Sequence, residues 1–95
     1  MIQHVVMFRW RADASEEAIA EATGQLARLS GVDGVTDFAC GRNFGKSRDV
    51  YPFVLTLRLA DKAALKTYWP HPLHAEVLAA VTPVVDDVFI ADFEI

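Results

Sequence analysis

The chain has 95 residues, of which 53% are hydrophobic, and it carries a formal net charge of −4 at pH 7. This length corresponds to one domain, and the apolar content excludes general disorder. Lys and Arg form no basic stripe, so the composition argues against nucleic-acid binding and against attachment to an anionic membrane.

Cysteine content and the start of the chain indicate a compartment. Cys40 is the single cysteine, which excludes an intramolecular disulfide and a Cys-rich metal site. Met1 leads directly into a strand-like run that lacks a signal-peptide pattern, and no apolar run is long enough to span a bilayer. We therefore expect a cytoplasmic protein.

The first part of the chain predicts a strand followed by a helix. Residues 2–10 alternate with apolar side chains on both faces, which is typical of a central strand covered on both sides. Residues 13–29 carry apolar side chains at helical spacing. Asp13 and Glu16 stand at the positions of a capping box, so we expect the helix to begin there.

Two further strands are predicted in the middle of the chain. Residues 32–43 predict a weaker strand, and the polar segment 43–49 predicts a loop. Residues 51–59 predict a third strand with one continuous apolar face. That face is expected to carry Tyr51, Phe53, Leu55, Leu57 and Leu59.

The last part of the chain predicts a broken helix and a final strand. Asp61 is the expected N-terminal cap of a short helix, which Pro70 and Pro72 must interrupt. Pro72 suits the first position of the next helix, and residues 87–95 predict a strand.

This order of elements predicts one α+β domain over residues 1–95 with the ferredoxin-like βαββαβ arrangement. Two helical segments can cover only one face of a four-stranded sheet. The other face would remain apolar and exposed. We expect it to carry Val5 and Met7, or the apolar face of residues 51–59 that includes Phe53. The sequence therefore predicts a homodimer.

The segment from Tyr68 to His74, YWPHPLH, is the most distinctive in the chain. A Tyr hydroxyl and two imidazoles beside a forced helix break could face a cavity and supply acid–base chemistry. Alternatively, His71 caps the last helix and His74 is a half-buried surface residue. His4, on an otherwise apolar strand face, is either a core residue or part of the same pocket wall.

Other polar residues carry weaker signals. His71 and His74 are separated by Pro72, and no third ligand stands at a recognisable spacing, so a metal site is poorly supported. Asp92 and Glu94 share one strand face, where they could be solvated or could pair with the arginines near residue 10. No cofactor-binding motif occurs, and we expect no cofactor.

The motifs HVVMF near the start, FACGRN, Tyr68 with HPLH, and the closing DFE together resemble the stress-responsive dimeric A/B barrel (Dabb) family. The resemblance runs from Ile2 to Glu94. It implies protomers whose sheets pack face to face in a dimeric α/β barrel. One branch of that family, olivetolic acid cyclase of plants, is a cofactor-free polyketide cyclase.

The resemblance also implies roles for particular residues. His74 matches the catalytic acid/base of the cyclase and Tyr68 its chain-orienting hydroxyl, whereas Phe53 stands where the cyclase has a His. We expect His4, His71 and Phe53 to contribute to a ligand-binding wall. Three functions follow: a cyclase-like or lyase-type enzyme for a phenolic or small hydrophobic compound, a non-catalytic binding module, or a structural stress protein.

Overall fold

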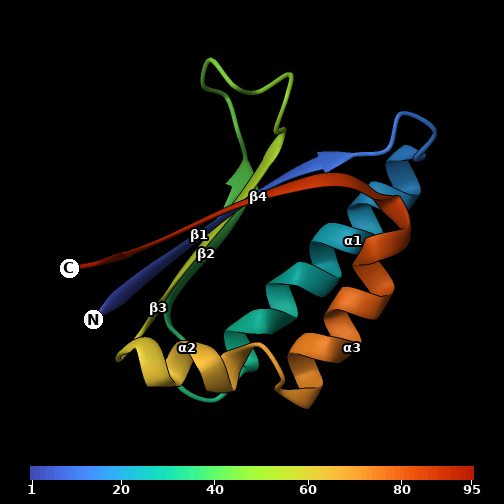
Figure 1. The fold of residues 1–95 in the computed structure, drawn as a ribbon. Coiled ribbons are helices and arrows are strands. Elements are labelled where there is room, and N and C mark those ends of the chain that lie inside the picture. Colours follow the sequence, from blue (N-terminus) through green and yellow to red (C-terminus); the bar gives the residue numbers. More distant parts are fainter.

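The computed structural model describes residues 1–95 and contains one four-stranded sheet with its helices on one side (Figure 1). The elements are β1 (Ile2–Trp10), α1 (Glu16–Ala27), the 3₁₀ helix η1 (Arg28–Gly31), β2 (Thr36–Arg42), β3 (Phe53–Leu59), α2 (Lys62–Tyr68), α3 (Pro72–Val81), the 3₁₀ helix η2 (Thr82–Val84) and β4 (Val85–Glu94).

The strands lie in the order β2-β3-β1-β4, and every neighbouring pair is antiparallel. This is the ferredoxin-like βαββαβ arrangement, and it confirms the predicted α+β fold. The pairing places His4 of β1 opposite Leu57 of β3 and Asp92 of β4. Segments that are far apart in the sequence therefore meet along β1.

The helix-covered face of the sheet forms the hydrophobic core. Alternate residues of β1 and β3 point towards the helices, because successive side chains of a strand face opposite sides. Leu57 and Val77 of α3 are 0% exposed, and full burial of such a side chain stabilises the fold by roughly 1.5–3 kcal/mol. From the sheet, the core receives Ile2, Val6, Phe8, Phe53, Leu55, Leu57 and Leu59.

The opposite face of the sheet has no helix on it, and we call it the open face. Val5 and Met7 of β1 lie there half-buried. They pair with Ala91 and Phe89 of β4, and the Phe89 side chain is 54% exposed. Val5 and Met7 were expected on the uncovered face and are found there. The face of β3 that carries Phe53 is the covered face instead, because its residues pair with the buried residues of β1.

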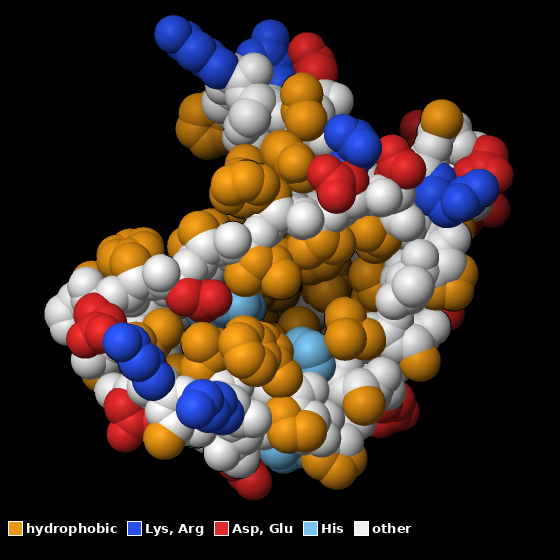
Figure 2. All heavy atoms as spheres, in the orientation of Figure 1, with side chains coloured by type: hydrophobic (Ala, Val, Ile, Leu, Met, Phe, Trp, Pro, Cys, Tyr) orange, Lys and Arg blue, Asp and Glu red, His pale blue; other side chains and the backbone are white.

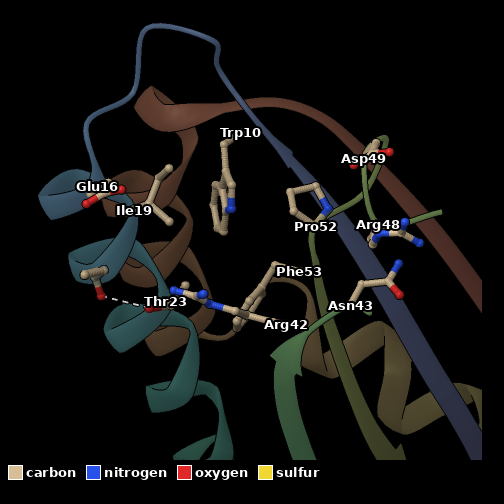
Figure 3. Close-up of a pocket in the computed structure, with 11 residues that line it drawn as sticks. Trp10, Glu16, Ile19, Thr23, Arg42, Asn43, Arg48, Asp49, Pro52 and Phe53 are labelled. Carbon is tan, nitrogen blue, oxygen red and sulfur yellow. Dashed lines mark hydrogen bonds between the residues drawn. The ribbon is translucent and has the colours of Figure 1, made fainter. Parts of the chain in front are cut away.

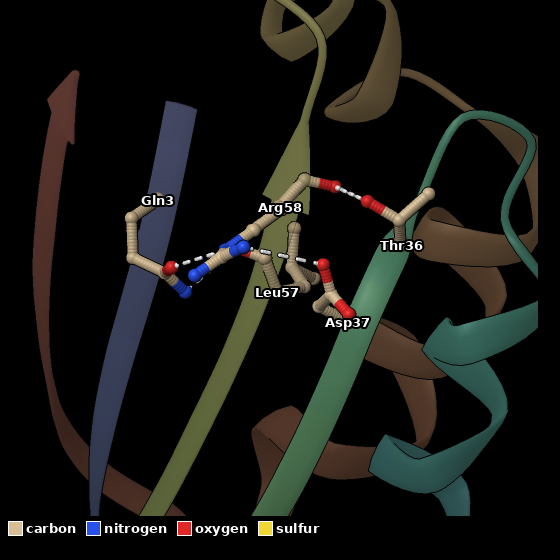
Figure 4. Close-up of polar contacts among 5 residues, drawn as sticks. All are labelled: Gln3, Thr36, Asp37, Leu57 and Arg58. Carbon is tan, nitrogen blue, oxygen red and sulfur yellow. Dashed lines mark hydrogen bonds and ion pairs between the residues drawn. The ribbon is translucent and has the colours of Figure 1, made fainter. Parts of the chain in front are cut away.

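One end of the open face carries a polar network (Figure 4). Arg58 donates to the side-chain oxygen of Gln3 at 2.9 Å and approaches Asp37 at 3.4 Å. Gln3 in turn donates to the Leu57 carbonyl at 3.2 Å. Asp37 has a φ of 48°, at a register shift between Thr36 and the rest of β2. This irregularity brings its carboxylate to the Arg58 guanidinium.

Helix α1 begins later than its sequence pattern indicates. The Ala18 amide donates to the hydroxyl of Ser15 at 3.1 Å, so Ser15 is the N-terminal cap. Asp13 lies two residues before this cap, and its carboxylate accepts from the Arg11 guanidinium at 3.0 Å. The prediction of an Asp13–Glu16 capping box was therefore wrong.

Strand boundaries also differ from expectation. β2 covers Thr36–Arg42 and not 32–43, and β4 begins at Val85. β3 begins at Phe53 because Pro52 has no amide hydrogen for the sheet. Tyr51 therefore does not share the Phe53 face. Its hydroxyl donates to the Asp87 carboxylate at 2.9 Å.

The two short helices follow the predicted pattern. Asp61 caps α2 by accepting from the Ala64 amide at 2.8 Å, and Pro72 occupies the first turn of α3. α1, the longest helix, has 12 residues, and none of the helices is long and apolar enough to cross a membrane.

Candidate active site

Three side chains from three elements meet at one end of the covered face. The ring centroids of Tyr68, at the end of α2, and His74, in the first turn of α3, are 4.6 Å apart. The ring of His4, the third residue of β1, is 5.6 Å from that of Tyr68. Both contacts are edge-on. We call these three residues the Tyr–His cluster.

The helix break between α2 and α3 makes this arrangement possible. Pro70 follows the end of α2, and Pro72 begins α3, so the chain turns within a few residues. The His71 amide still donates to the Tyr68 carbonyl at 3.2 Å, which keeps the turn tight. His74, six residues after Tyr68, is thereby returned to the side of the Tyr68 ring.

Tyr68 is 2% exposed, and burial raises the pKa of its hydroxyl to about 12. The phenol consequently keeps its proton across the physiological range. A neutral phenol can donate a hydrogen bond to a carbonyl or to an oxygen that gains negative charge.

His74 is held in its neutral form. Burial is the main cause that lowers its pKa, and the nearby His4 and His71 lower it further, while the Trp69 carbonyl acts in the opposite direction. The Nδ1 atom of His74 is buried and has no hydrogen-bond partner in the structure. Buried polar atoms are nearly always paired, so this nitrogen is available to a ligand or to a bound water molecule.

His4 is fixed by a carboxylate. Its Nδ1 atom bonds to the Oδ1 atom of Asp92, which lies directly opposite on β4. His4 is 2% exposed, whereas the Asp92 side chain is 29% exposed. Asp92 therefore pairs with His4, and not with an arginine near residue 10. It orients the imidazole against Tyr68.

Tyr68 and His4 are themselves buried, and the molecular surface is hollowed nearby. Figure 2 shows a hollow between β4 and the helices that is walled mainly by apolar side chains, with imidazole groups in it. A separate groove of about 410 Å³ includes Asp92, Trp69 and Phe93 in its wall. Asp92 thus joins the buried His4 to the surface.

His71 and Phe53 lie outside the cluster. His71 caps α3, because its Nδ1 atom accepts from the Leu73 amide at 3.1 Å. Its Nε2 atom is 3.9 Å from the exposed Asp33. Phe53 packs against Trp10 at the other end of the sheet, with ring centroids 5.8 Å apart.

A larger cavity of about 590 Å³ lies at that other end of the sheet (Figure 3). Phe53 contributes to its wall, and so does Trp10. The two candidate sites are thus at opposite ends of the helix-covered face. No group of three or more His, Cys, Asp or Glu side chains lies close enough to hold a metal ion.

Asp92 and the residues around Phe53 were not identified as site residues from the sequence. A signal for Asp92 existed, because the βαββαβ topology makes β1 and β4 neighbours, and only the register was needed to place Asp92 opposite His4. The second cavity had no such signal, since its wall combines α1, the end of β1 and the loop between β2 and β3.

Comparison with protein families and curated proteins shows one consistent relation. The model of the Stress responsive A/B Barrel Domain matches residues 2–95. One stress-response A/B barrel domain-containing protein of Arabidopsis thaliana is 28% identical over 95 residues; the match covers 98% of this chain but only 36% of that longer relative. A second Arabidopsis thaliana protein of the same description is 26% identical over 97 residues, which cover 98% of this chain and 85% of the relative.

Solved structures share the fold. A dimeric ferredoxin-like protein of unknown function from Thermobifida fusca superposes with a TM-score of 0.85 at 23% identity, and the match covers 99% of this chain and 90% of the other. A hydroxynitrile lyase from Passiflora edulis superposes with a TM-score of 0.82 at 12% identity, over 97% and 90% of the two chains.

Proposed function

The chain belongs to the stress-responsive A/B barrel domain family, and we propose that it is a cofactor-free enzyme for a small carbonyl compound. In this proposal His74 is the general base and Tyr68 the hydrogen-bond donor. The reaction makes or breaks a carbon–carbon bond next to the carbonyl carbon. A reducing cytoplasm is the proposed location, given the single free Cys40.

The observation that carries the proposal is the unpaired Nδ1 atom of His74 beside a neutral phenol. A neutral imidazole can take a proton from the carbon α to a carbonyl, and the electron pair of that C–H bond then moves onto the carbonyl oxygen. Tyr68 would donate its hydrogen bond to this oxygen as the negative charge develops. The resulting enolate carbon attacks a second carbonyl carbon, whose C=O π electrons move onto its oxygen, and this oxygen takes the proton back from the His74 imidazolium in an aldol-type closure.

The same two groups fit the cleavage of a cyanohydrin. Removal of the hydroxyl proton by His74 forms the carbonyl while cyanide leaves with the electron pair of the broken bond. We include this reaction because a hydroxynitrile lyase has the same fold. The similarity to that lyase, at 12% identity, supports the fold alone, and experiment must distinguish the two reactions.

The working unit is proposed to be a homodimer joined through the open face. Val5, Met7 and Phe89 would otherwise present an apolar surface to water. Sedimentation equilibrium at micromolar concentration is expected to report twice the 10.5 kDa chain mass. A monomer that retains its native circular dichroism would contradict this assembly.

The catalytic proposal is tested with two probes on the purified protein. One is deuterium incorporation at the α-carbons of phenylacetone in D₂O, followed by NMR, and the other is release of benzaldehyde from mandelonitrile. We expect turnover of at least one probe. His74→Ala should lower its rate by roughly 10²–10⁴-fold, and Tyr68→Phe by less, with both variants retaining the native melting temperature within a few degrees.

His71→Asn is the matched control, because Asn retains the capping acceptor and removes an imidazole outside the cluster. Its rate should change far less than that of His74→Ala, because His71 acts on the proposed base only through its charge. Undiminished turnover in His74→Ala would refute the proposal. Saturable binding of both probes with no turnover would instead identify a non-catalytic binding module.

A further inference from the structure

The cavity of about 590 Å³ at the far end of the sheet is distinct from the Tyr–His cluster. Its aromatic wall begins at Trp10, six residues along β1 from His4, a distance of roughly 20 Å at the rise of a strand. Phe8 lies between the two positions on the same face and is 5% exposed. The cavity volume is within the roughly 300–1,000 Å³ typical of small-molecule pockets.

One wall of this cavity is built for a flat apolar group. Trp10 and Phe53 meet with ring centroids 5.8 Å apart, and both pack on Phe8 at 6.1 and 6.2 Å. Ile19 of α1 faces them across the cavity (Figure 3). A ring bound here would contact aromatic faces that the core already holds in place.

Arg42, at the end of β2, supplies an unused cation at the same cavity. The other five arginines each bond to a protein group: Arg9 to Asp86, Arg11 to Asp13, Arg28 to Glu76, Arg58 to Gln3 and Asp37, and Arg48 to the Gly45 carbonyl. The Arg42 guanidinium makes neither a hydrogen bond nor an ion pair within the chain. It therefore retains its full donor set for a ligand.

Figure 3 shows how the charged groups of the wall are arranged. Arg42 extends across the floor of the cavity towards Thr23 of α1. The carboxylates of Glu16 and Asp49 lie at the rims on opposite sides of the view. Arg48 lies on the loop side, next to Asn43. The positive charge within reach of a ring on Trp10 is thus that of Arg42.

We infer that this cavity binds a small aromatic carboxylate, with its ring between Trp10, Ile19 and Phe53 and its carboxylate on Arg42. A guanidinium and a carboxylate form paired, charge-assisted hydrogen bonds, which fix both the charge and the orientation of the ligand. The inference is independent of the proposed reaction at the Tyr–His cluster.

The experiment uses ¹⁵N-labelled protein and the indole N–H signals of its two tryptophans. Titration with 1-naphthoate should shift the Trp10 signal saturably and leave the Trp69 signal in place, since Trp69 is on α2's C-terminal side, away from the cavity. Trp69→Phe assigns the two signals. The neutral isostere 1-naphthamide should bind at least about 10-fold more weakly.

Arg42→Gln should weaken 1-naphthoate binding by about 10- to 100-fold and leave 1-naphthamide binding unchanged. Arg28→Gln, which removes an exposed guanidinium outside the cavity, is the matched control and should bind as the parent does. Equal affinity for acid and amide, or equal loss in the two Gln variants, would overturn the inference. So would a shift of Trp69 without one of Trp10.

Discussion

The two faces of the sheet carry similar residues and meet different surroundings. On the covered face, Val6 and Leu55 are 7% and 1% exposed, and even the polar His4 is 2% exposed. On the open face, Val5 and Met7 of the same strand are only half-buried, and Phe89 is 54% exposed. Apolar character in β1 therefore does not reveal which face the chain itself covers. The helices decide this, and they leave the other face of the sheet uncovered.

A charge on the open face tests this comparison most severely. Met7→Asp would place an unpaired carboxylate in the proposed interface, where burial of an unpaired charge costs several kcal/mol. We expect loss of the dimer, measured by sedimentation, together with a lower melting temperature. Ala79→Asp adds the same charge on the exposed side of α3 and should leave assembly intact.

Truncation on the covered face should cost about the same whether or not a partner is present. Leu57 is 0% exposed, so Leu57→Ala should lower the free energy of unfolding by about 2–5 kcal/mol. Urea denaturation at fixed protein concentration measures this. Thr56→Ser, one residue away on the open face, is the control and should change the free energy by less than about 1 kcal/mol. Equal effects would mean that the faces are not differently packed.

A smaller effect is expected from the cap that directs α2 towards the Tyr–His cluster. Asp61→Ala removes the acceptor of the Ala64 amide and should lower the free energy of unfolding by about 1 kcal/mol. Asp61→Ser retains an acceptor and should restore most of that loss. Thermal unfolding of the parent and the two variants measures these differences. Identical free energies of unfolding would show that the cap does not contribute to stability.

The smallest effect is a pH dependence that originates at His74. Burial lowers the pKa of His74 in the folded protein below the ordinary value of about 6.5, so the unfolded chain binds its proton first as the pH falls. Stability is therefore complete above about pH 6.5 and decreases as the pH falls towards the lowered pKa. Urea denaturation between pH 5 and 8 should show this slope, and His74→Phe should reduce it. If the dependence of stability on pH is unchanged in that variant, other titratable groups cause it.

Much of the protein could be predicted from local patterns. Alternation in residues 2–10, the cap at Asp61 and the stop between Tyr68 and Pro72 depend on neighbours in the sequence, so they could be recognised without a structure. These signals defined the element order and hence the ferredoxin-like fold. They also placed Tyr68 and His74 on either side of one helix break, which the structure closes to 4.6 Å.

Tertiary structure alone decided the partners of the charged and polar side chains. Asp92 meets His4 across 88 residues of sequence and Arg58 meets Gln3 across 55, whereas the fold brings no hydrogen-bond acceptor to the Arg42 guanidinium. The sequence pattern allowed the apolar face around Phe53 to lie on the uncovered side, which was wrong for a related reason. Alternation in a strand defines two faces but not which one the helices cover, because that depends on strand register and helix packing, which are contacts between residues distant in the sequence.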